Sequence, residues 1–108
     1  MNEITNISEL NVNDSILLRT LLFTDSIEME LDYIADYESQ EISRATLLFE
    51  GCRKVEFLIN PGFDTPNLLL CAEEEGTPEA RKIKIETNTT AGTIRIECSK
   101  VYFRQSTL

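Results

Sequence analysis

The clearest pattern in the chain is a strict alternation of apolar and acidic positions from 27 to 33. The apolar positions are Ile27, Met29, Leu31 and Tyr33, and the acidic positions between them are Glu28, Glu30 and Asp32. A period of two places successive side chains on opposite faces of a strand. A helix capped at Asp25 or Ser26 competes with this interpretation, because Glu and Met are good helix formers. We favour a strand within residues 24–38, because four alternations hold without a miss.

Alternation returns in the last third of the chain, at residues 81–87 and 93–98. It predicts two strands with apolar residues facing the core. The inward positions are Ile83, Ile85, Ile94, Ile96 and Cys98, and the outward positions are Lys82, Lys84, Glu86, Arg95 and Glu97. Val101 and Phe103 then continue in the opposite phase. A β-bulge or a break near Ser99 would return them to the core.

Two apolar runs flank Gly51, at residues 45–49 and 55–60. The glycine supplies a positive φ for a turn, so we expect these runs to form an antiparallel hairpin. Other apolar runs, at 16–23 and 68–72, predict further strands. The glutamate-rich segment 73–79 contains a glycine and a proline, which predicts an exposed acidic loop.

These elements amount to seven or eight strands with turn signals every 8–12 residues. That pattern is typical of an all-β protein, here an antiparallel sandwich or partly open barrel. A chain of 108 residues is expected to form a single small all-β domain, 1–108. Within it, residues 1–13 would be an N-terminal arm or contain a short helix around Ser8–Leu10.

The composition excludes several kinds of catalytic site, metal site and binding partner. The chain has no histidine, which excludes histidine-based catalysis and histidine-ligated metals. Its three cysteines are far apart and lie in or beside apolar runs, so they are interpreted as small core residues. A net charge of −9 argues against nucleic acid and anionic membranes as partners. The N-terminus lacks the pattern of a secretory signal, so a cytoplasmic location is expected.

The acidic residues are concentrated, since residues 25–41 carry seven acids and no base. We take this stretch as the candidate partner-binding surface. The candidate residues are Glu28, Glu30, Asp32, Asp36, Tyr37 and Glu38. Glu28, Glu30 and Asp32 could instead form a solvated face, or pair with Lys82, Lys84 or Arg95 on another strand. No metal site is expected, because no glycine turn would wrap carbonyl groups around an ion. No cofactor or catalytic residue is assigned, because no serine has the neighbours that would activate it.

The chain also resembles a broad group of small bacterial all-β domains. The resemblance rests on Asp14-Ser15, the alternating acidic strand and the segment LLFEGCRKV at 47–55, and it covers roughly residues 14–104. Most of that group has no known function, and some members are encoded beside polymorphic toxins and described as immunity proteins. The resemblance implies an all-β fold and assigns no functional residue.

Three hypotheses follow for the function. The first is a non-enzymatic protein–protein interaction module whose acidic face binds a basic protein, such as a toxin-immunity protein masking a cationic toxin. The second is a self-associating structural domain, in which an edge strand pairs across a two-fold axis to give a homodimer. The third is a small-molecule-binding β-barrel, which requires a concave apolar pocket.

Overall fold

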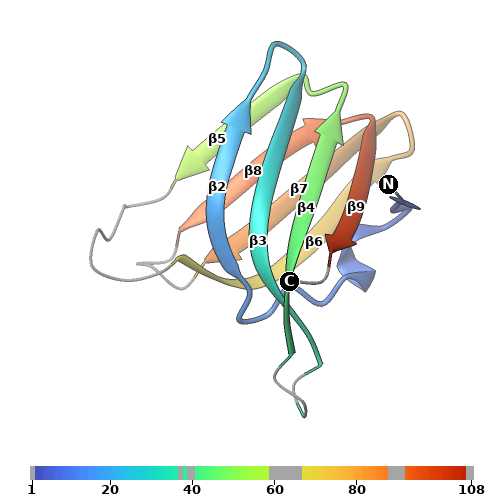
Figure 1. Cartoon of the computed structure of the whole chain (residues 1–108). Helices are drawn as coiled ribbons and strands as arrows, with labels where there is room; N and C mark the ends of the chain where they lie inside the picture. Colours follow the sequence, from blue (N-terminus) through green and yellow to red (C-terminus); the bar gives the residue numbers. More distant parts are fainter. Residues whose placement is uncertain (1, 37, 39–40, 59–66, 88–91, 107–108) are drawn as a thin grey trace.

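The computed structural model describes residues 2–36, 38, 41–58, 67–87 and 92–106 and is an open, two-layered antiparallel β structure (Figure 1). The strands are β1 (Asn2–Glu3), β2 (Ile16–Leu22), β3 (Ser26–Asp36), β4 (Glu41–Glu50), β5 (Lys54–Leu58), β6 (Asn67–Thr77), β7 (Ala80–Thr87), β8 (Thr93–Cys98) and β9 (Lys100–Ser106). The all-β prediction is confirmed. The strand beyond the expected eight is the two-residue β1. No helix among the described residues has the length and apolar character needed to cross a membrane.

The strands form two layers that share one continuous hydrogen-bonded order, β1-β9-β4-β3-β2-β6-β7-β8-β5. We call β1, β9, β4, β3 and β2 the front sheet, and β6, β7, β8 and β5 the back sheet (Figure 1). The layers join where Ile16 and Leu17 of β2 pair with Leu68 and Asn67 of β6. The order begins at β1 and ends at β5 without closing, so the architecture is an open sandwich.

The core lies between the sheets and follows from the alternation in the sequence. The inward side chains of β3 are almost fully buried, which confirms the strand prediction and excludes the competing helix. The predicted inward positions of β7 and β8 are buried as well. The largest fully buried side chains include Phe49, Ile27, Met29, Leu31, Leu47, Ile83, Ile85, Ile94 and Ile96. At the edge of this core the Tyr33 and Phe103 rings meet edge to face, with centroids 5.3 Å apart.

The predicted hairpin around Gly51 is wrong. β4 pairs with β3 and β9 in the front sheet, whereas β5 pairs with β8 in the back sheet. Gly51 does have a positive φ, of 65°, but it begins an arch between layers. Both edges of β4 are occupied, so the chain after it has to cross to the other sheet. The backbone N–H of Cys52 donates to the Asp25 carbonyl and ties this arch to the β2–β3 turn.

The phase change near Ser99 is confirmed as a break. β8 ends at Cys98 and β9 begins at Lys100, and the two strands belong to different sheets. Because the chain crosses the core at Ser99, Cys98 and Val101 both face inward. The amide of Ser99 donates to the Glu50 carbonyl, so this crossing is joined to the end of β4.

The N-terminal segment is docked and partly buried. A 3₁₀ helix, η1 (Ile7–Glu9), forms close to the predicted position, and its cap residue Asn6 accepts a hydrogen bond from the Ser8 amide. Ile7 and Val12 are almost fully buried in the core. β1 pairs with β9 of the front sheet, and η1 packs against β6 of the back sheet. The segment therefore covers one open side of the sandwich.

The predicted acidic loop at 73–79 is mostly strand. β6 continues to Thr77, and β7 begins at Ala80. Glu73, Glu74 and Glu75 lie opposite Lys84, Ile83 and Lys82 of β7. The pairing of acidic with basic residues across the two strands stabilises an extension that composition alone does not indicate.

Candidate functional site

The predicted partner-binding residues separate into two groups along β3. Glu28, Glu30 and Asp32 share the outer face of the front sheet, where each is half-buried. Asp36 is the last residue of β3, and Glu38 is exposed in the turn that follows. Tyr37 lies outside the described residues. The structure therefore brings three of the six together on a flat surface and places two others at the far end of a hairpin.

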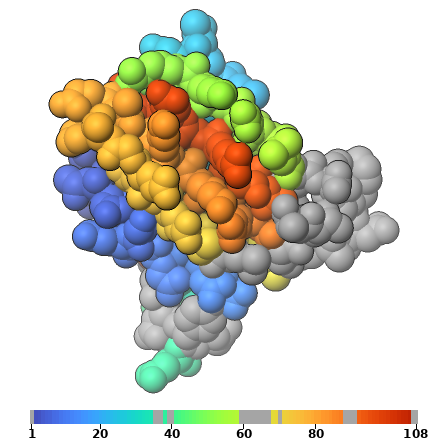
Figure 2. Space-filling model, turned by 180° about the vertical axis from the view of Figure 1, so that it is seen from behind, coloured from blue at the N-terminus to red at the C-terminus, as the bar shows by residue number. Residues whose placement is uncertain are grey.

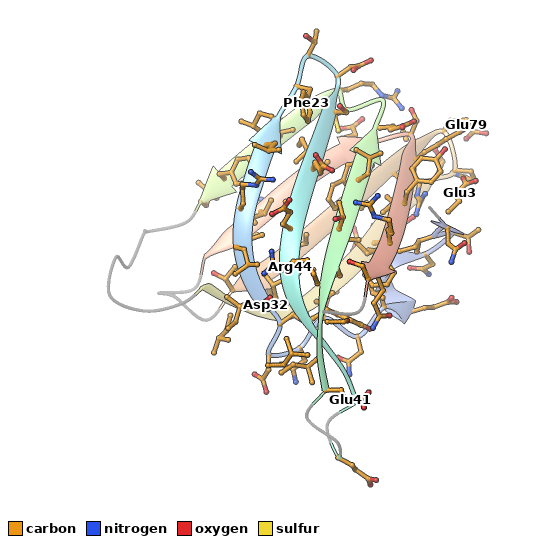
Figure 3. All side chains as sticks on the ribbon, viewed as in Figure 1. Glu3, Phe23, Asp32, Glu41, Arg44 and Glu79 are labelled. Carbon is orange, nitrogen blue, oxygen red and sulfur yellow. The ribbon has the colours of Figure 1, made fainter. Side chains whose placement is uncertain are left out.

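The acidic residues on the outer face of β3 have basic neighbours. Glu30 receives a hydrogen bond of 2.5 Å from Arg19 of β2. Asp32 accepts one of 3.2 Å from Arg44 of β4 (Figure 3). The expected pairing with Lys82, Lys84 or Arg95 is wrong, because those residues lie on β7 and β8 in the back sheet. The strands beside β3 are β2 and β4, and only they can supply its cross-strand partners.

The front face as a whole has mixed charge. Beyond β4, the adjoining strand β9 presents Arg104 opposite Thr46, and Lys100 opposite Glu50. The acidic stripe of β3 is therefore bordered by basic side chains on both sides. Glu28 differs from its neighbours, since no ion pair within the described residues includes it.

The end of the β3–β4 hairpin carries acidic residues in a stretch of sequence that holds no base. It projects beyond the body of the sandwich, at the bottom of the view, and Glu41 lies near its end (Figures 1 and 3). Glu38 and Glu41 are exposed. The sequence from 33 to 43 holds three acids and no base. This protruding end, with Asp36, Glu38 and Glu41, is here named the acidic tip.

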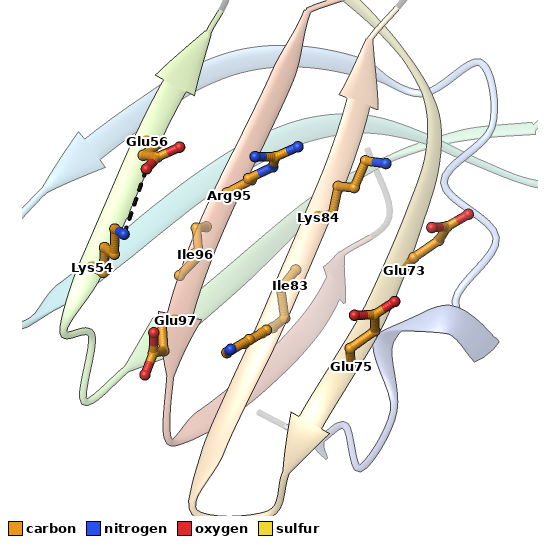
Figure 4. Close-up of a pocket in the computed structure, with 10 residues that line it drawn as sticks. Lys54, Glu56, Glu73, Glu75, Ile83, Lys84, Arg95, Ile96 and Glu97 are labelled. Carbon is orange, nitrogen blue, oxygen red and sulfur yellow. Dashed lines mark ion pairs between the residues drawn. The ribbon is translucent and has the colours of Figure 1, made fainter.

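A second surface was not anticipated from the sequence: a groove of about 430 Å³ on the outer face of the back sheet (Figures 2 and 4). It is lined by Lys54, Glu56, Glu73, Glu75, Lys82, Ile83, Lys84, Arg95, Ile96 and Glu97. Acidic and basic side chains are interleaved across β6, β7, β8 and β5. The outward residues of β7 and β8 were predicted from alternation. Glu73 and Glu75 were assigned to a loop, and the order of the four strands was not predicted.

The centre of the groove contains two cations in direct cross-strand register. Lys84 of β7 lies opposite Arg95 of β8, an arrangement that is repulsive by itself. Lys84 is 3.0 Å from Glu86 on its own strand, and the hydrogen bond to Glu86 raises the pKa of the lysine. Glu56 of β5 lies opposite Arg95 and is 3.7 Å from Lys54 (Figure 4). The groove is therefore a balanced charged surface.

A buried ion pair was missed entirely by sequence reasoning. Arg81 Nε and Nη2 each donate to the Glu74 carboxylate at 2.7 Å, and only 6% and 12% of the two side chains are exposed. The same Arg81 donates to the Ile4 carbonyl, and the Ile7 amide donates to Glu74. Arg81 shares the phase of Ile83 and Ile85, a signal from which its inward position could have been predicted.

Two opposing effects act on the pKa of Glu74 in this pair. Burial acts to raise the pKa of the Glu74 carboxyl, but hydrogen bonds from Arg81 and the Ile7 amide, together with the arginine charge, lower it overall. The hydrogen bond to Glu74 in turn raises the pKa of Arg81. Both groups remain charged at neutral pH. The pair connects the β6–β7 hairpin to the N-terminal segment, and we assign it a structural role.

The thiols offer no activated nucleophile. Cys98 is fully buried, and burial together with nearby Cys52 raises its pKa to about 12. Burial also raises the pKa values of Cys52 and Cys71. Catalytic thiols require the opposite shift. Among the residues that the structure describes, no three His, Cys, Asp or Glu side chains gather closely enough to hold a metal ion.

The chain was compared with known protein families and with curated proteins, and neither comparison finds a match. The functional interpretation therefore rests on the surfaces described above.

Proposed function

We propose that the protein is a non-enzymatic interaction module that binds a basic protein through its acidic tip. The observation that carries this proposal is the distribution of charge along β3. Glu30 and Asp32 form ion pairs with Arg19 and Arg44, and the hairpin end adds three acids in a stretch of sequence without a base, of which Glu38 and Glu41 are exposed.

The position of the tip supports its use in binding. A protruding hairpin can reach a concave or flat partner without the rest of the sandwich approaching it (Figure 1). Complementary charge speeds encounter and selects the partner more than it adds affinity. The net charge of −9 gives the whole molecule a field that attracts a basic protein over a longer range.

An immunity function is one setting for this activity. The resemblance to small bacterial all-β domains supports it, since some of them are described as immunity proteins. In that setting the acidic tip covers a cationic surface of a toxin, such as the substrate-binding surface of a nuclease. The proposal places the protein in the cytoplasm, and three free thiols are consistent with a reducing compartment.

The small-molecule alternative receives less support. It required an apolar concave pocket, but the groove of the back sheet lies on the outer surface and is lined mainly by charged side chains. The space between the described strands is filled by the side chains of the core.

The test uses the purified products of the genes that flank the coding sequence, each titrated by calorimetry at low and high salt. Glu38→Gln with Glu41→Gln removes two charges from the acidic tip. The expected result is binding at low salt that weakens about tenfold in this double variant.

The matched control is Glu9→Gln with Glu79→Gln, which removes two exposed charges elsewhere and should leave binding nearly unchanged. Glu28→Gln, near the opposite end of β3 from the tip, should also leave binding nearly unchanged. If neither product bound at low salt, or if both double variants lost affinity equally, the acidic tip would not be the binding surface.

A further inference from the structure

The N-terminal segment lies along the outer edges of β6 and β9. Three further strand edges lack a full-length partner among the described residues. β1 contributes only two residues. β2 pairs with β6 at one end only, and its register with β3 is interrupted by a bulge between Leu17 and Arg19. β5, in contrast, pairs with β8 over all five of its residues without a register shift. Short and bulged edges resist pairing with another chain, so β5 is the edge suited to it.

The exposed side of β5 also carries apolar surface. Phe57 and Leu58 are 39% and 61% exposed. β5 lies at the margin of the back sheet, as seen from the front and from behind (Figures 1 and 2). A strand added alongside it would satisfy backbone hydrogen-bonding groups and cover part of these side chains.

The outer charges of the back sheet form two cross-strand rows that end on β5. The first row is Glu75, Lys82, Glu97 and Lys54, and the second is Glu73, Lys84, Arg95 and Glu56. One row therefore ends at the free edge in a cation and the other in an anion. An antiparallel strand that continued the sheet would need an anion opposite Lys54 and a cation opposite Glu56. A second copy of β5, turned by a two-fold axis, supplies both.

Only certain two-fold registers preserve the faces of the sheet. Directly opposite residues must point to the same face, so the axis has to pass through a single residue of β5. An axis at Glu56 places two glutamates opposite each other, which is repulsive. An axis at Phe57 leaves Glu56 opposite Leu58. An axis at Val55 places Lys54 opposite Glu56 of the second copy, and symmetry repeats the pair.

We propose that two copies of this chain associate through β5 in the register centred on Val55, joining their back sheets into one continuous antiparallel sheet. The contact between the two β5 strands, here called the seam, places a cation opposite an anion in both charged rows. The two grooves become parts of one charged surface. The acidic tip takes no part in this contact, so the inference goes beyond the proposed function.

Sedimentation equilibrium of the full chain, from low to high micromolar protein, measures the association. The wild type should dimerise, more strongly at low salt than at high salt. Lys54→Glu and Glu56→Lys each create like-charged pairs at the seam and should raise the dimer dissociation constant about tenfold. An equimolar mixture of the two variants should recover association, because every seam pair is then opposite in charge.

Controls separate this contact from general charge effects. Lys100→Glu makes the same charge change on an exposed residue of the front sheet and should leave the dimer intact. Glu38→Gln with Glu41→Gln should also leave it intact, which distinguishes this seam from the acidic tip. Thermal unfolding confirms that each variant is folded, since both Lys54 and Glu56 point outward.

Either of two results would overturn the proposal. One is a wild type that stays monomeric at high micromolar concentration and low salt. The other is a dimer that tolerates Lys54→Glu as well as it tolerates Lys100→Glu. A dimer weakened by Glu56→Lys but not by Lys54→Glu would reject the Val55 register specifically.

Discussion

The arginine–carboxylate pairs of the two sheets are chemically alike but differ in their surroundings. In the back sheet, Arg81 forms two hydrogen bonds to Glu74, and both side chains are almost fully buried. In the front sheet, Arg19 and Arg44 each form a single hydrogen bond to an acid, and their side chains are 55% and 43% exposed. The burial of the pair, more than its chemical type, determines what each contributes to the fold.

The buried pair also connects parts of the chain that no backbone ladder joins. Through Ile4 and Ile7 it fixes the N-terminal segment against the open side of the sandwich. The front pairs connect neighbouring strands that the backbone ladder already joins. We therefore expect loss of the buried pair to release a covering segment and loss of a front pair to change only a surface.

The largest expected effect is that of Arg81→Met. It leaves the Glu74 carboxylate buried without its partner, and such changes cost about 3–5 kcal/mol of unfolding free energy. Urea denaturation measures the loss. Hydrogen exchange should show lower protection at Ile4 and Ile7, whose backbone groups join the network.

The double variant Glu74→Leu with Arg81→Met tests the cause. Removing both charges should restore part of the stability lost in either single variant, because no unpaired charge remains. If Arg81→Met lowered the unfolding free energy by less than about 1 kcal/mol, the buried pair would contribute no more than an exposed surface ion pair. The difference between the two sheets would then not hold.

The next effect concerns the turn that brings the buried pair together. Gly76 has a φ of +94°, and a Cβ placed there would collide with the Ala80 carbonyl. Gly76→Ala should therefore cost about 2 kcal/mol, from backbone strain and displacement of the β6–β7 turn. Denaturant unfolding gives the value. Thr77→Ala, which removes the side-chain bond to the Ala80 amide, should cost about 1 kcal/mol and serves as the neighbouring control.

The pH dependence of stability gives a smaller, more specific signal. The pKa of Glu74 is lower in the folded protein than its ordinary value, since hydrogen bonds and the Arg81 charge outweigh burial. Its stabilising contribution is fully present above the unfolded pKa of about 4.3 and disappears as pH falls through the folded pKa. Unfolding followed from neutral to acid pH should show a smaller loss in Glu74→Gln than in the wild type. Equal losses would mean that this carboxyl is not coupled to folding.

Alternation predicted the inward faces of β3, β7 and β8, because every second side chain of a strand with one covered face points into the core. It also located the phase break at Ser99. It could not show that Gly51 begins an arch between sheets, since a hairpin and an arch both need a turn between apolar runs. That choice depends on β9, which is distant in sequence and occupies the second edge of β4.

The candidate site was predictable only in part, for a related reason. The acidic stretch was visible, but Arg19 and Arg44 could be assigned to it only after β2 and β4 were known to flank β3. Glu74 was interpreted as a loop residue because its glutamate-rich segment contains Gly76 and Pro78. Its partner, Arg81, lies across a short turn and shares the inward phase of Ile83. The charged groove required the order of four strands, which local periodicity does not encode.

The smallest effects are expected on the front sheet, for Arg44→Ala and Arg19→Ala. Each removes a single exposed ion pair, so the unfolding free energy should fall by about 0–1 kcal/mol. Denaturation at low and high salt measures the loss, which should shrink as salt screens the pair. Both variants leave Glu30 or Asp32 uncompensated and make the front face more acidic, so binding of a basic partner should strengthen at low salt. A loss of stability comparable to that of Arg81→Met would show that these exposed pairs also hold the fold together.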